Sequence, residues 1–65
     1  MDVNELDVII LKDGTEGVVL EVFKDNLPPG AVPSVMIEKT ALEADYELPI
    51  VPISEIEKVI IKHNK

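Results

Sequence analysis

Five short apolar runs, each bounded by glycine, proline, asparagine or aspartate, constrain the fold of this chain more than any other feature. The runs cover residues 6–12, 18–23, 34–39, 46–51 and 57–62. Nine valines and eight isoleucines stand against three alanines, and β-branched side chains in runs of this length favour strands. The sequence therefore predicts an all-β protein.

The segment before the last run is the only place where the sequence favours helix. Ser54 can accept a hydrogen bond from an amide of a first helical turn. We expect one helical turn at about Pro52 to Ile56, and a continuous helix over residues 54–62 is the alternative. Pro49 and Pro52 cannot donate to a strand ladder, so they predict an exposed sheet edge nearby.

The turns give the predicted order a family resemblance. The segment Leu11-Lys12-Asp13-Gly14-Thr15-Glu16-Gly17-Val18 is similar to the strand, glycine turn and second strand of KOW-type domains. Residues 46–59 resemble the closing half of small bacterial SH3-like proteins of unknown function. The resemblance covers residues 6–62 and implies a five-stranded SH3-like barrel or roll.

The length of 65 residues allows one domain with one core. We expect this domain to span residues 1–65, with frayed ends at 1–5 and 63–65. The acidic start lacks the basic segment of a secretory signal. The longest apolar stretch has four residues, against the roughly 20 that a membrane helix needs. These features predict a cytoplasmic protein that does not associate with membranes.

The strands carry apolar residues on both faces, which is more than one small core can hold. Alternation puts Val8 and Ile10 on one face of the first strand, and we assign that face to the core. The other face leaves a candidate interaction surface of Ile9, Leu11, Phe23 and Tyr46, which a protein partner or a second copy in a homodimer would cover. The full predicted core comprises Leu6, Val8, Ile10, Val19, Leu20, Val22, Val35, Ile37, Leu48, Val51, Ile53, Ile56 and Val59.

The composition argues against two functions that the resemblance would suggest. A net charge of −7 without any arginine opposes contact with a phosphate backbone. Two aromatic residues cannot pave a groove for proline-rich peptides. We expect a non-catalytic protein-interaction module that acts through an acidic, partly apolar surface. The alternatives are a KOW-like module associated with nucleic acid or the ribosome, and an acidic antitoxin or decoy that mimics nucleic acid.

Few residues offer catalytic or metal-binding chemistry. The single histidine, His63, lies in the predicted frayed end, where a general base would not be held in place. Glu43, Asp45 and Glu47 alternate and could share one strand face as oxygen ligands, but a solvated face has the same pattern. We therefore expect no enzyme activity, cofactor or metal.

Overall fold

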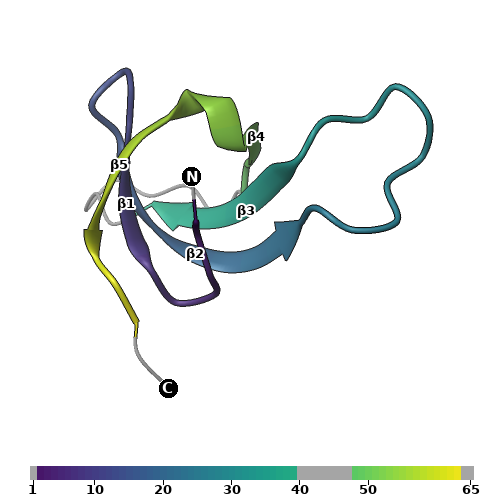
Figure 1. The fold of residues 1–65 in the computed structure, drawn as a ribbon. Helices are drawn as coiled ribbons and strands as arrows, with labels where there is room; N and C mark the ends of the chain where they lie inside the picture. The colour runs from purple at the N-terminus through teal and green to yellow at the C-terminus, as the bar shows by residue number, and fades with distance from the viewer. Residues whose placement is uncertain (1, 40–47, 64–65) are drawn as a thin grey trace.

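A computed structural model describes residues 2–39 and 48–63 and shows one curled antiparallel sheet (Figure 1). Its strands pack in the order β4-β3-β2-β1-β5. The all-β prediction is confirmed, and so is the helical turn before the last strand. The elements are β1 (Val8–Leu11), β2 (Glu16–Phe23), β3 (Ser34–Lys39), β4 (Ile50–Pro52), the 3₁₀ turn η1 (Ile53–Glu55) and β5 (Ile56–Ile61).

The turn between β1 and β2 follows the predicted chemistry. Gly14 has φ 94°, and its N–H donates to the Leu11 carbonyl at 2.9 Å. The Asp13 carboxylate accepts from the Thr15 N–H, also at 2.9 Å. Hydrogen bonding from Thr15, chiefly from its backbone N–H, keeps the pKa of Asp13 below its usual value. Aspartate and glycine therefore close this hairpin for different reasons, one as an acceptor and one through its backbone freedom.

The 3₁₀ turn differs in detail from the prediction. Pro52 occupies the N-cap position in an extended conformation, and no side chain caps the turn, so the predicted capping role of Ser54 is wrong. The backbone supplies the anchoring instead, because the Ile53 N–H donates to Pro33 and the Lys12 N–H donates to Glu55, both at 2.9 Å. The alternative of a helix over residues 54–62 is also wrong.

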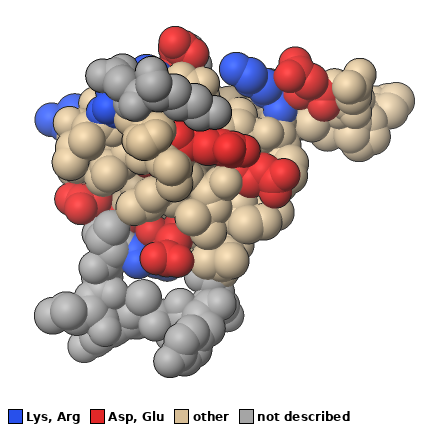
Figure 2. Space-filling view, turned by 90° about the horizontal axis from the view of Figure 1, so that it is seen from below, with Lys and Arg blue, Asp and Glu red and all other residues tan. Residues whose placement is uncertain are grey.

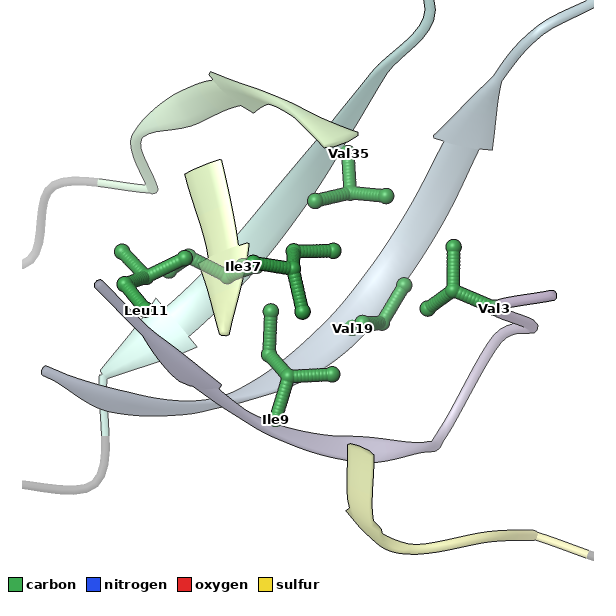
Figure 3. Close-up of a cluster of buried hydrophobic side chains, with 7 residues drawn as sticks. Val3, Ile9, Leu11, Val19, Val35 and Ile37 are labelled. Carbon is green, nitrogen blue, oxygen red and sulfur yellow. The ribbon is translucent and has the colours of Figure 1, made fainter. Parts of the chain in front are cut away.

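The core lies on the concave side of the sheet, where side chains from several strands point toward one another (Figure 3). Four predicted core residues are buried, and Val22, Val51, Ile53 and Val59 pack against them. Leu6 and Leu48 are instead exposed, and Val8, Ile10 and Leu20 are half-buried. The buried hydrophobic residues are Val3, Ile9, Leu11, Val19, Val35, Ile37 and Ile56.

The face of β1 is therefore the reverse of the predicted one. Ile9 and Leu11 are buried, so they do not belong to an interaction surface. Asp7, a fully buried carboxylate, lies on the same strand face as these two residues. Alternation alone separates the two faces of a strand and does not decide which of them is buried.

Both predicted frayed ends need correction. Val3 is fully buried in the core cluster. At the other end, the His63 N–H donates to the Asp7 carboxylate at 2.8 Å. The described parts of both ends are therefore held by contacts with the rest of the fold.

Candidate functional site

The convex side of the sheet, which we call the outer face, carries apolar side chains in two cross-strand rows. Cross-strand partners share a face, so the register defines its members. Val8 lies between Val18 on β2 and Ile61 on β5, which forms an apolar row across three strands. A second row pairs Met36 on β3 with Ile50 on β4. Ile50 and Ile61 are both well exposed, at 58% and 61%.

A β-bulge in β2 adds another apolar side chain to this face. Val19 pairs with Ile37 and Glu21 pairs with Met36, so Leu20 is the extra residue. Two residues of β2 thus stand opposite one residue of β3, and the strand bends there. The bulge brings Val22 back to the core side and leaves Leu20 half-buried. An alternation pattern alone cannot reveal this shift.

Acidic side chains lie among these apolar residues. Glu16 pairs with Ile10, Glu38 pairs with Val18, and Glu21 is exposed beside the bulge. In the register of the described strands, one lysine, Lys58, joins them opposite Ile10. Figure 2 shows acidic groups spread among other side chains on the side that lies below β2 in Figure 1. The outer face is therefore apolar in composition and negative in charge.

A partly buried ionic cluster, with the fully buried Asp7 at its centre, lies at one end of this sheet. The Asp7 carboxylate accepts from the Asn4 N–H at 2.8 Å, the His63 N–H at 2.8 Å and the Lys62 ammonium at 3.1 Å. The same ammonium donates to the Asp2 carbonyl at 2.9 Å. Burial raises the pKa of Asp7, but the two N–H groups and Lys62 lower it by more, so its pKa lies below the ordinary value.

The polar groups of this cluster supply one another's hydrogen-bond partners, so the cluster acts as a structural clasp that joins the two ends of the chain. Every described buried side-chain nitrogen or oxygen has a hydrogen-bond partner. The carboxylate is fully buried and is not accessible to a substrate. Sequence analysis missed this residue, although an aspartate at the start of an apolar run, in phase with Ile9 and Leu11, is the pattern that could have indicated it.

Two open grooves flank the sheet. One, of about 560 Å³, is lined by Val3, Asn4, Glu5, Val22, Lys24, Lys62 and His63. The other, of about 540 Å³, lies between the β1–β2 turn and η1 and is lined by Leu11, Lys12, Asp13, Val51, Pro52 and Glu55. Neither lining combines a nucleophile with a base in hydrogen-bond contact, so neither groove supports a catalytic assignment.

The structure describes three of the four predicted surface residues and does not bring these three together on one face. Ile9 and Leu11 lie in the core, as described above. Phe23 pairs with Ser34 at the end of the outer face and is half-buried. Tyr46 lies outside the described residues, as do the three acids from Glu43 to Glu47 that were weighed as metal ligands. Within residues 2–39 and 48–63, no group of three acidic, histidine or cysteine side chains could hold a metal ion.

Comparisons of the chain with protein-family models, with curated proteins and with solved structures find no significant match. The resemblance to SH3-like and KOW-type domains therefore stays a prediction. Among the described residues, no helix has the length and apolar character to cross a membrane.

Proposed function

We propose that this protein is a non-catalytic module that binds another protein through the outer face of its sheet. The observation that carries the proposal is the row of Ile61, Val8 and Val18 across three strands. Apolar side chains that continue across neighbouring strands form a patch, and contiguous apolar patches mark interaction sites. Ile61 is 61% exposed in this row, so the row is open to a partner.

Three properties make a binding role fit better than the alternatives. The described grooves hold no catalytic pair, and the buried carboxylate is committed to structural hydrogen bonds. The outer face carries more glutamates than lysines, which opposes contact with nucleic acid. Apolar residues with charged ones among them also fit a protein interface, because such interfaces combine apolar and polar area.

The test compares two exposed apolar residues, one on the outer face and one away from it. Ile61 lies on the outer face at 61% exposure, and Val32 lies in the β2–β3 loop at 56%. We expect Ile61→Lys to lose the proteins that wild type captures from native lysate, and Val32→Lys to retain them. Direct binding of the purified partner then gives the affinity change for each variant.

Two outcomes contradict the proposal. Equal capture by Ile61→Lys and wild type would place binding elsewhere on the molecule. Tight binding of DNA or RNA in a gel-shift assay at low salt would favour the nucleic-acid alternative instead. Circular dichroism on both variants checks that each one keeps the all-β fold.

A further inference from the structure

The backbone of Leu6 is held in a conformation that leucine rarely adopts. Leu6 has φ 71°, in the left-handed region that favours glycine and asparagine. Its side chain is 51% exposed, so core packing does not explain the choice of leucine. The Leu6 N–H donates to the Val19 carbonyl at 2.7 Å, which fixes the residue against β2.

The hydrogen bonds place Leu6 just before β1, beside β2 and two residues from Val8. The Leu6 N–H donates to the Val19 carbonyl and the Val19 N–H donates to the Asp7 carbonyl, so Leu6 and Asp7 together stand opposite Val19, as the two residues of a β-bulge do. The turn that carries Leu6 is closed by Asp7, whose N–H donates to the Asn4 carbonyl and whose carboxylate accepts from the Asn4 N–H. An exposed apolar side chain is thus presented from a rigid backbone beside an apolar surface.

The charges around Leu6 indicate the chemistry of its partner. Glu5 precedes it and is exposed, and Glu21 and Glu38 are exposed on the outer face. The whole chain carries −7. A second copy would bring the same carboxylates against this surface, whereas a basic surface would neutralise them.

We infer that the outer face binds a basic protein segment with apolar side chains, and that Leu6 is the anchor residue of this contact. The inference rests on the proposed function and adds the chemistry of the partner. A pre-ordered backbone lowers the entropic cost of binding, and a strained position is retained where the side chain has a use. The glutamates attract the partner, and Leu6 together with the apolar rows supplies the dry contact.

The probe is a short amphipathic peptide of lysine and leucine, with a control peptide that has glutamate in place of lysine. Amide chemical shifts report where each peptide binds. We expect the lysine peptide to perturb Val8, Val18 and Leu20, and the glutamate peptide to leave them unchanged. Raising the salt from about 0.1 to about 1 M should weaken binding about tenfold, because the Debye length falls from about 10 to about 3 Å.

Variants test the anchor and the charges separately. Leu6→Gly accepts the positive φ and should weaken binding about tenfold while the fold is kept. Leu6→Asn, which also tolerates this backbone, should act in the same way. Paired replacement of Glu21 and Glu38 by lysine should abolish binding of the lysine peptide. Asp25→Lys, on the β2–β3 loop, is the matched charge control and should bind with an affinity close to wild type.

The outcomes separate this inference from the proposed function. Equal binding of both peptides to the outer face would overturn the basic partner and leave an apolar interaction face in place. Unchanged binding by Leu6→Gly would overturn the anchor. Absence of lysine-peptide binding would overturn the inference, while lysate capture by Ile61→Lys still decides the proposed function. Sedimentation that shows a dimer through this face would assign it to a second copy and overturn the basic partner.

Discussion

Replacement of Asp7 is the sharpest test of how this small fold is held together. The carboxylate is fully buried and accepts three hydrogen bonds from Asn4, Lys62 and His63. Asp7→Ala leaves two backbone N–H groups without their acceptor, while the Lys62 ammonium keeps its hydrogen bond to the Asp2 carbonyl. Hydrogen bonds to a charged group contribute about 1.5–3 kcal/mol each, and they are not additive. Because Lys62 is partly exposed and can recover water, we expect a total loss of about 3 kcal/mol.

This loss is large for a chain of 65 residues, whose whole free energy of unfolding is about 3–10 kcal/mol. It corresponds to a fall in melting temperature of about 15 °C. Urea denaturation followed by circular dichroism measures the change in unfolding free energy. Asp25→Ala, at an exposed aspartate, is the matched control and should change stability by less than about 0.5 kcal/mol.

The pH dependence gives a second measurement of the same cluster. Because the folded pKa of Asp7 is lowered, its carboxylate stabilises the fold above the unfolded pKa of about 3.9. This contribution is lost as the pH falls through the folded pKa. Asp7→Asn cannot titrate, so the stability difference between wild type and this variant should shrink below about pH 4. A constant difference down to pH 2, or a loss under about 0.5 kcal/mol in Asp7→Ala, would refute the clasp.

Three further substitutions test separate features. Gly17→Ala should destabilise the fold by about 1 kcal/mol in urea denaturation. The reason is that its new Cβ would lie 3.1 Å from the Glu38 carbonyl and 3.2 Å from the Ile37 side chain. Unchanged stability would mean that β2 and β3 separate easily. Leu6→Gly should stay within about 1 kcal/mol of wild type, since relief of the positive φ offsets the lost apolar contact; a larger loss in thermal unfolding would show that the side chain is needed for folding. Lys62→Met should raise the pKa of the buried Asp7 carboxylate and lower the stability of the fold by about 1 kcal/mol. Nuclear magnetic resonance titration measures this pKa. An unchanged pKa would show that the ammonium is not part of the clasp.

Local chemistry made the element order of this fold predictable. Turn residues such as Gly14 stand at the ends of the strands, and the strands themselves are rich in β-branched residues. The predicted third strand, residues 34–39, coincides with β3. The predicted turn around Ser54 coincides with η1, although no side chain caps this turn. These elements could be found because each depends on residues close together in sequence.

The candidate site could not be predicted because it depends on contacts between distant parts of the chain. The partners that allow Asp7 to be buried, Lys62 and His63, lie 55 and 56 residues away. Without them, a charged residue next to an apolar run indicates a solvent-facing position. The bulge at Leu20 could not be predicted for the same reason. It is defined by the pairing of β2 with β3, and no residue type in β2 indicates it. Of the three predicted surface residues that the structure describes, Phe23 alone lies on the outer face.

The clasp and the outer face follow from one structural choice, and this links stability to binding. Burial of Asp7 puts Ile9 and Leu11 into the core and turns Val8 and Ile10 outward, because strand side chains alternate. The hydrogen bonds to Asp7 also close the turn that presents Leu6. Loss of the carboxylate should therefore lower both stability and binding, whereas Leu6→Gly should lower binding alone. Two variants one residue apart thus distinguish a residue that builds the surface from a residue that forms the contact.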